Sequence, residues 1–198
     1  MAMKKILVAI ATMFIACAAM SAQDQLEFLG VPVKGTVKSL TQDLRKVGFK
    51  PDRYRAGLYY GKYRKQSVQV VLGLDADGSD HTHVLVLNYP VAKSWKATVN
   101  QYERVKMALA ADYGQPTMSR EEYDYPYTEA DGFRALDEGK CRYITTFSIY
   151  EGGTTDNGAP VGSAAAFRKD GGKPFLGEIT LTISPEDRKV RVYFRAVD

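Results

Sequence analysis

The chain has 198 residues, of which 45% are apolar and 25% charged, and its formal net charge is +4. These proportions are those of an ordinary globular domain, and they exclude a disordered, collagenous or coiled-coil chain. Only two Cys and two His are present. This scarcity excludes a disulfide framework and a zinc ribbon, and it restricts any His-dependent catalysis to His81 or His83.

The first 22 residues have the layout of a secretory signal peptide. Two lysines precede an apolar run over residues 6–16, and small residues follow up to Ala22. The apolar run is too short to cross the hydrocarbon core of a bilayer. We therefore expect cleavage after Ala22 and export to the periplasm or the medium, with no transmembrane segment in the mature chain. Lipid attachment at Cys17 is the alternative, because the residues before it faintly resemble a lipobox.

Two segments have the apolar spacing of amphipathic helices. Residues 36–47 place apolar side chains three and four positions apart, with a threonine to cap the start and a glycine after the end. Residues 94–113 repeat the pattern with a serine cap, and a glycine again follows the last residue. A proline two or three positions beyond each glycine prevents continuation of the helix.

Six segments indicate strands by apolar alternation or by short apolar runs. They are residues 58–63, 68–74, 84–89, 143–150, 179–183 and 190–197. The first two are predicted to form a hairpin around Lys65 and Gln66. Residues 84–89 are apolar on both faces, which favours a central strand, and residues 184–187 have turn chemistry between the last two strands.

The order of these elements predicts an α+β fold, with a mainly antiparallel sheet and the two amphipathic helices packed on one face. We expect a degenerate internal duplication of helix-plus-strands modules over residues 23–93 and 94–198. An acidic, Tyr-rich insertion at 117–139 interrupts the second module, and the Gly-rich residues 151–162 are expected to form an exposed loop. No Gly-rich phosphate-binding fingerprint is present, which argues against a Rossmann or P-loop fold.

At the level of architecture the chain resembles small exported proteins of the Gram-negative envelope. In both halves a helix that ends in glycine and proline is followed by an antiparallel meander, and the nearest families are the β-lactamase-inhibitor-protein-like and PepSY-like folds. The opening residues 28–36 (FLGVPVKGT) are similar to the start of a set of uncharacterised exported proteins. This resemblance implies a role in binding proteins or in envelope assembly rather than in catalysis, and it carries over no binding residue.

Charge is segregated along the chain. Residues 34–66 hold ten Lys and Arg against two Asp, whereas residues 73–151 hold thirteen acidic and eight basic residues. In an exported protein the basic segment does not indicate nucleic acid, and an anionic glycan, a lipid headgroup or an acidic face of an envelope protein is the expected partner. The candidate binding residues are Arg55, Tyr59, Lys62, Tyr63 and Arg64. Cross-strand packing and solvation of a hairpin explain the same residues without a ligand.

A cluster of possible metal ligands lies between two predicted strands. Its members are Asp75, Asp77, His81 and His83. Two histidines two positions apart on a strand would face the same side and could share a metal ion. Because Asp-Gly is also a hairpin-turn signal, turn chemistry is the favoured explanation; no cofactor is assigned, and a divalent-metal-binding protein is kept as an alternative.

No motif in the sequence indicates an enzyme. There is no nucleophile elbow and no HExxH motif, and Cys141, which begins an apolar-alternating run, is expected to be a buried structural thiol. An envelope hydrolase acting on peptidoglycan or glycan is the alternative, with paired carboxylates from Glu121, Glu122, Asp124, Glu129 and Asp131. The primary interpretation is a non-catalytic exported binding or interaction protein of the cell envelope, with no catalytic residue assigned.

Overall fold

The computed structural model describes residues 24–74, 79–151, 153–154 and 173–197. In these residues the chain forms an α+β fold with one large sheet, and every strand pairing in that sheet is antiparallel. The predicted fold class is therefore confirmed in its coarse form. The expected signal peptide, Cys17 and most of the expected loop at 151–162 lie outside the described residues.

The strands that the alternation predicts form the body of the sheet. They are β5 (Leu58–Tyr63), β6 (Gln66–Leu74), β7 (His81–Asn88), β9 (Cys141–Tyr150), β11 (Phe175–Ile183) and β12 (Val190–Ala196). The hairpin turn lies one residue earlier than predicted, at Arg64 and Lys65, because Tyr63 pairs directly with Gln66. Both turn residues have positive φ, 47° and 69°, as a two-residue hairpin turn requires.

Shorter elements complete the fold. They are β1 (Glu27–Phe28), β2 (Val31–Pro32), β3 (Gly35–Thr36), β4 (Lys50–Pro51), β8 (Met118–Tyr123), β10 (Gly153–Thr154) and the short helices η1 (Glu129–Asp131) and α3 (Gly132–Asp137). The segment 117–139, expected to interrupt the pattern, thus supplies β8, which pairs with β9. Five of the six residues of β8 are exposed, so no buried face imposes the alternation that would have revealed a strand.

Both long helices begin and end where the sequence predicts. In α1 (Val37–Lys46) the Thr36 hydroxyl accepts from the Ser39 N–H at 3.2 Å. In α2 (Trp95–Tyr113) the Ser94 hydroxyl accepts from the Ala97 N–H at 3.3 Å. The glycine that follows α2, Gly114, has φ 85°, a value that favours glycine over residues with a side chain. Local capping chemistry therefore sets the limits of both helices.

Strands from the two halves of the chain meet in the middle of the sheet. The order along the sheet is β10-β9-β11-β12-β7-β6-β5-β4, with β8 also on β9 and β3 also on β7. At the seam between β7 and β12, Leu85 pairs with Phe194 and Leu87 with Val192. All four side chains are fully buried, so the apolar layer continues from one half into the other.

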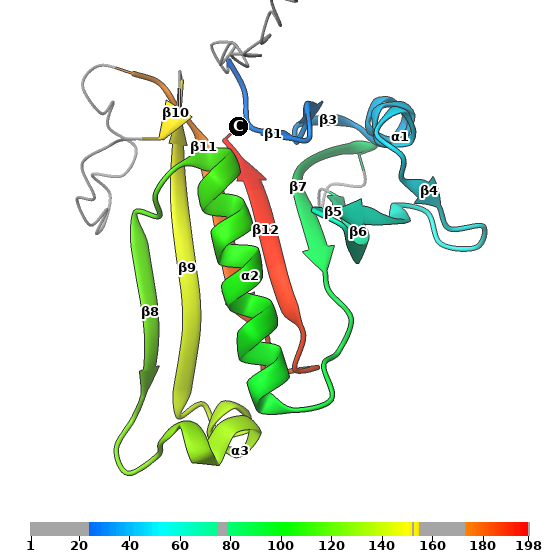
Figure 1. The fold of residues 1–198 in the computed structure, drawn as a ribbon. Helices are drawn as coiled ribbons and strands as arrows, with labels where there is room; N and C mark the ends of the chain where they lie inside the picture. The colour runs from blue at the N-terminus through cyan, green and yellow to red at the C-terminus, as the bar shows by residue number, and fades with distance from the viewer. Residues whose placement is uncertain (1–23, 75–78, 152, 155–172, 198) are drawn as a thin grey trace, which may run out of the picture.

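This apolar layer lies under α2, which Figure 1 shows running along one face of the sheet over β9, β11 and β12. The helix buries Tyr102, Val105 and Leu109, and the Tyr102 hydroxyl lies 2.6 Å from that of Thr145 on β9. The shorter α1 packs beside β2, β3 and β4, and its Thr41 hydroxyl lies 2.5 Å from that of Tyr59 on β5.

The N-terminal segment closes the core between the halves. Phe28 is fully buried, and its ring centroid lies 5.8, 5.5 and 5.3 Å from those of Phe49, Tyr63 and Phe194. Aromatic pairs at these separations add to the free energy gained from burying their area. The segment around Phe28 is thus part of the core that both halves share.

The β5–β6 hairpin is also tied directly to α2. Asp112 of α2 accepts a hydrogen bond from the buried Tyr63 hydroxyl at 2.6 Å and one from the Arg64 Nε at 3.1 Å, and a second Arg64 nitrogen contacts its other oxygen. The Arg64 side chain is half-exposed, which limits the ion pair to a small contribution. The hydrogen bond from the buried Tyr63 hydroxyl makes the Asp112 carboxylate important for stability, because a buried donor without an acceptor is destabilising.

We predict that Asp112→Ala lowers the free energy of unfolding by about 1–3 kcal/mol, because it leaves the Tyr63 hydroxyl buried without its acceptor. Tyr63→Phe removes the hydroxyl itself and should cost less. Urea unfolding of the two variants and of the double variant measures both costs. A larger loss in Tyr63→Phe than in Asp112→Ala would contradict this explanation.

Gly61 of β5 lies under an aromatic ring. A Cβ atom at this position would come within 2.6 and 2.8 Å of Cε1 and Cγ of the buried Phe49 ring. We predict that Gly61→Ala destabilises the protein by about 1–3 kcal/mol through overpacking. Phe49→Leu makes room, so the double variant should lose less stability than the sum of the single changes in thermal unfolding. Strictly additive losses would show that the ring is not the obstacle.

Candidate functional site

The five residues predicted to bind lie on different sides of the β5–β6 hairpin. Tyr59 and Tyr63 point into the core and are 2% and 1% exposed. Lys62, between them in sequence, is exposed on the opposite face, as strand alternation requires. Arg64 lies in the turn against a carboxylate of α2, and Arg55 lies in the loop before β5 against a neighbouring carboxylate. The structure does not bring the five into one surface, and a binding role for Arg55, Lys62 and Arg64 stays a prediction.

The predicted metal ligands are only partly described. Asp75 and Asp77 lie outside the described residues, and the Nδ1 of the exposed His81 is 3.2 Å from a carboxylate oxygen of Asp80. A register shift falls between Thr82 and Val84, so the simple alternation that would put His81 and His83 on one face is interrupted. Among the described residues, no three His, Cys, Asp or Glu side chains are grouped to hold a metal ion.

Of the five carboxylates considered for hydrolysis, Glu121 and Glu122 lie on β8, Asp124 follows it, and Glu129 and Asp131 lie in η1. Four of the five have basic partners. Glu121 lies 2.5 Å from Lys106, and Arg142 lies 3.1 Å from Glu122 and 3.4 Å from Asp124. Burial alone would raise the pKa of Glu121, but hydrogen bonds from Lys106 and Ser119 outweigh it and hold the pKa below its usual value. A glycosidase acid needs the opposite shift. These surroundings favour an ion-paired surface rather than a catalytic pair.

The buried Cys141 has the surroundings of a structural thiol. It is 5% exposed, and burial, with a smaller contribution from Asp137, raises its pKa to about 11. A nucleophilic cysteine needs a lowered pKa and an accessible sulfur. The sequence-based expectation of a buried thiol at this position is confirmed.

We predict that Cys141, in a chain that begins at residue 23, reacts with a disulfide reagent at pH 8 roughly 100-fold more slowly than an unperturbed thiol, from ionisation alone. Burial should slow the reaction further, so that labelling follows transient unfolding. Absorbance of the released thiolate measures the rate, with the denatured chain as the fast control. Prompt labelling of the native protein would show that the sulfur is accessible.

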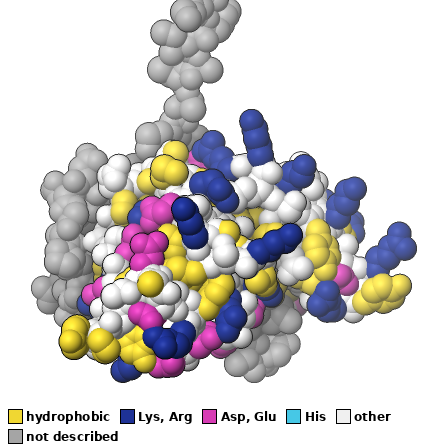
Figure 2. Space-filling view, turned by 60° about the horizontal axis from the view of Figure 1, so that its bottom comes forward, with side chains coloured by type: hydrophobic (Ala, Val, Ile, Leu, Met, Phe, Trp, Pro, Cys, Tyr) yellow, Lys and Arg dark blue, Asp and Glu magenta, His cyan; other side chains and the backbone are white. Residues whose placement is uncertain are grey.

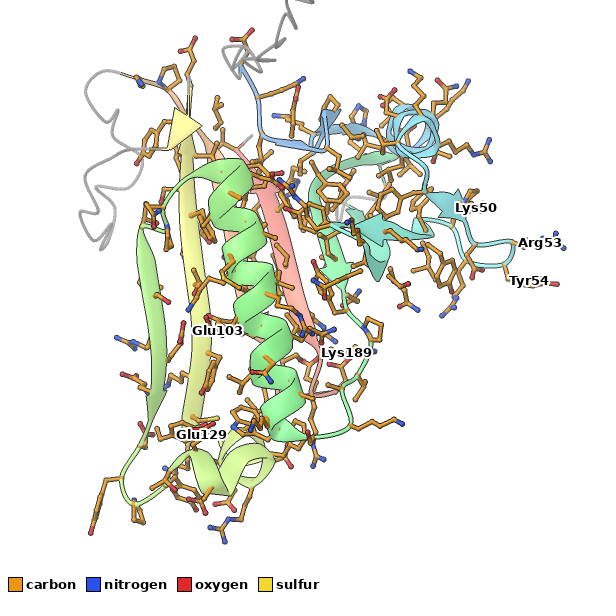
Figure 3. The ribbon with its side chains drawn as sticks, viewed as in Figure 1. Lys50, Arg53, Tyr54, Glu103, Glu129 and Lys189 are labelled. Atoms are coloured by element: carbon orange, nitrogen blue, oxygen red, sulfur yellow. The ribbon has the colours of Figure 1, made fainter. Side chains whose placement is uncertain are left out.

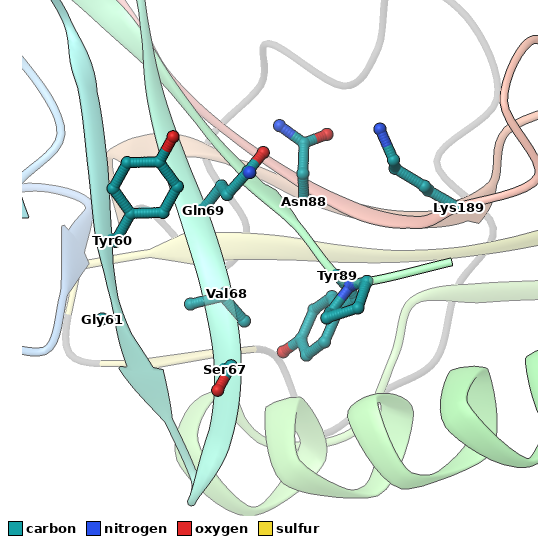
Figure 4. Close-up of a pocket in the computed structure, with 9 residues that line it drawn as sticks. Tyr60, Gly61, Ser67, Val68, Gln69, Asn88, Tyr89 and Lys189 are labelled. Carbon is teal, nitrogen blue, oxygen red and sulfur yellow. The ribbon is translucent and has the colours of Figure 1, made fainter. Parts of the chain in front are cut away.

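A groove opens on the sheet where β6 and β7 leave their pairing, and it has a volume of about 390 Å³. Polar side chains and apolar ones share its lining, which consists of Tyr60, Gly61, Ser67, Val68, Gln69, Asn88, Tyr89, Pro90 and Lys189. Figure 4 shows Tyr60, Gln69, Asn88 and Lys189 in one row across the view, with Tyr89 below them. The groove therefore combines Tyr60, Gln69 and Asn88, which look away from the apolar layer, with the core residues Val68 and Tyr89.

Strand register explains how these side chains come together. Tyr60 of β5 pairs with Gln69 of β6, Gln69 pairs with Asn88 of β7, and Asn88 pairs with Arg191 of β12. Residues directly opposite on neighbouring antiparallel strands share a face and lie about 5 Å apart. The four form a continuous polar row across four strands, which we call the polar ladder.

The aromatic end of the polar ladder is held in place by hydrogen bonds. The Tyr60 hydroxyl donates to Asp52 Oδ2 at 3.0 Å and accepts from Arg55 at 3.0 Å. The other oxygen of Asp52 accepts from the N–H groups of Tyr54 and Arg55, each at 2.9 Å. The hydrogen bond from the Tyr54 N–H is the main reason that the pKa of Asp52 lies below its usual value. Tyr60 thus presents a fixed, partly exposed ring to the groove.

The charges around the groove are predominantly positive. Lys189 and Arg191 share Asp187, with nitrogen–oxygen distances of 2.9 and 2.8 Å. Lys50 pairs across the strands with Tyr60, and Lys62 pairs with Ser67. Within the described parts of the chain, neither of these two lysines has an ion pair. An anionic group would therefore find unneutralised cations beside the groove.

One buried polar atom beside the groove lacks a partner. The hydroxyl of Tyr89, a residue that also lines the groove, is buried and has no hydrogen-bond partner in the described structure. Its burial raises the pKa of Tyr89 above the usual value, so the group is a neutral donor. Buried hydroxyls are normally paired, which makes this one a candidate partner for a water molecule or a ligand.

The groove offers hydrogen-bonding groups to a ligand. Among the residues that line it there is no carboxylate, imidazole or thiol. The amides of Gln69 and Asn88 each offer a donor and an acceptor. Sequence reasoning did not identify the groove, although Gln69 occupies a position between the apolar residues of the predicted strand 68–74.

Comparison of the chain with protein-family models, with curated proteins and with solved structures gave no match. Within the described residues, none of the helices is long and apolar enough to span a membrane.

Proposed function

We propose that this chain is an exported, non-catalytic binding protein of the cell envelope, and that its groove takes an anionic glycan. The observation that carries the proposal is the polar ladder of Tyr60, Gln69, Asn88 and Arg191 on the sheet face opposite the apolar layer. The export part of the proposal depends on the signal-peptide layout of residues 1–22.

A hydroxyl-rich ligand fits the uncharged side chains of the groove. A sugar hydroxyl both donates and accepts, and the amides of Gln69 and Asn88 do the same. The partly exposed ring of Tyr60 gives a flat apolar surface beside these amides. A mostly preformed pocket with a few fixed polar groups is the usual design of a small-ligand site.

An acidic group on the same ligand fits the surrounding cations. Lys189 lines the groove, and Lys50 and Lys62 stand next to lining residues on β4 and β5. Because Asp187 already neutralises part of the Lys189 charge, the two unpaired lysines supply the larger share of the attraction. Screening by salt should weaken this part of the binding.

We also propose that the two halves of the chain are an internal duplication, and that α1 and α2 pack on the same face of the sheet. The order β5-β6-β7 followed by β12-β11-β9 places the last strand of each half at the seam, antiparallel to the other, as two related modules facing each other would require. The contacts of Thr41 with Tyr59 and of Tyr102 with Thr145 involve residues of the apolar layer. They support two helices on that face and leave the opposite face for a ligand.

We predict that the mature chain binds oligogalacturonate, an acidic sugar, more tightly than a neutral malto-oligosaccharide in isothermal titration calorimetry. Gln69→Ala and Asn88→Ala should each weaken binding about three- to tenfold, the value of one lost hydrogen bond. Lys62→Glu should weaken binding of the acidic sugar and leave the neutral sugar unaffected.

Thr180→Ala is the matched control, because Thr180 lies on the same sheet face but does not line the groove. Its affinity should equal that of the unaltered chain. Equal affinities in the groove variants and in the control, or the absence of binding to both sugars, would overturn the proposal.

A further inference from the structure

The loop between β4 and β5 carries the most exposed aromatic residue of the basic half of the chain. Tyr54 is 93% exposed, and arginines precede and follow it in sequence. Figure 3 shows Arg53 and Tyr54 projecting from the body of the molecule at the end of this loop. A single exposed ring is common on protein surfaces, so the significance of Tyr54 depends on the order of its loop and on the charges around it.

This loop, residues 52–57, which we call the finger, is ordered by its own hydrogen bonds. The Asp52 N–H donates to the Leu58 carbonyl at 2.8 Å, and the Leu72 N–H of β6 donates to the Gly57 carbonyl at 2.9 Å. The Asp52 carboxylate also accepts from the N–H groups of Tyr54 and Arg55. A preorganised loop loses little conformational entropy on binding. The hydrogen bonds of the finger therefore hold its tip in a conformation that is ready to bind.

The finger stands at the basic end of the molecule. Figure 2 shows Lys and Arg side chains gathered over the side that holds α1, β4 and the finger, and acidic side chains mostly toward the other side. Four exposed cations of this end have no ion pair with a described carboxylate: Lys38, Arg45, Lys50 and Arg53. They are spread over a helix, a strand and a loop rather than collected around a pocket.

We propose that the finger docks the protein on an anionic lipid surface, with Tyr54 at the level of the headgroups and the surrounding cations against lipid phosphates. A tyrosine ring suits the membrane interface because its body is apolar and its hydroxyl remains hydrated. A protruding tip with diffuse positive charge matches a broad anionic surface better than it matches one complementary protein pocket. Each cation near such a surface strengthens partitioning about fivefold. This docking does not depend on a ligand in the groove.

The test is sedimentation of the mature chain with vesicles of phosphatidylcholine alone or mixed with phosphatidylglycerol, without sugar. We expect binding to the mixed vesicles only, and weaker binding as salt is raised. Tyr54→Ala and Arg53→Ala should each reduce partitioning several-fold. Tyr125→Ala is the matched control, because Tyr125 is 97% exposed but lies in the acidic segment next to Asp124.

A fluorescence experiment locates the contact. The chain has one tryptophan, Trp95, which is buried, so a Tyr54→Trp variant adds one exposed reporter. Its emission should shift to the blue with mixed vesicles, whereas Tyr125→Trp should not shift. Equal shifts in both variants, or no vesicle binding, would overturn the proposal. The proposal would also be overturned if the chain bound soluble polyglutamate but not vesicles, and if Tyr54→Ala left the binding of polyglutamate unchanged. That result would assign the basic end to an acidic protein.

Discussion

The fold depends on one continuous apolar layer that crosses the seam between β7 and β12. Strands far apart in sequence pair there, and Leu85, Leu87, Val192 and Phe194 are buried on the same face. Burial of such side chains is worth about 1.5–3 kcal/mol each, enough to outweigh the entropy lost in bringing distant segments together. Phe28 covers the layer where the two halves meet, so neither half of the sheet has a separate core.

Burying one face of an antiparallel sheet leaves the other face available, and this separation produces the candidate site. The alternation that sends Tyr59 into the core sends Tyr60 outward. Because the register is set by the apolar face, the outward residues of four strands are aligned as precisely as the core residues. The polar ladder is therefore held by the rigid part of the fold, and the Asp52 carboxylate joins its Tyr60 end to the finger through hydrogen bonds. The polar ladder and the packed core therefore result from the same strand alternation.

Much of the local structure could be predicted from the sequence, and much of the site could not. Capping residues and apolar spacing predicted both long helices, because these signals are local. Alternation predicted that Tyr59 and Tyr63 share a face, but it could not tell that this face is the covered one. The pairing of Asn88 with Arg191 joins residues about a hundred positions apart, and no local pattern indicates it. The exposed strand β8 was missed for the converse reason, because without a buried face it has no alternation to detect.

The central claim is that the sheet face opposite the apolar layer is the ligand-binding face. Chemical-shift mapping of the isotope-labelled mature chain during titration with oligogalacturonate tests it most directly, because it reports on every backbone amide at once. We expect perturbed amides on β5, β6 and β7 around Tyr60, Gln69 and Asn88, with the amides of α2 unaffected. Perturbations confined to α2 or to β8, with the groove silent, would contradict it.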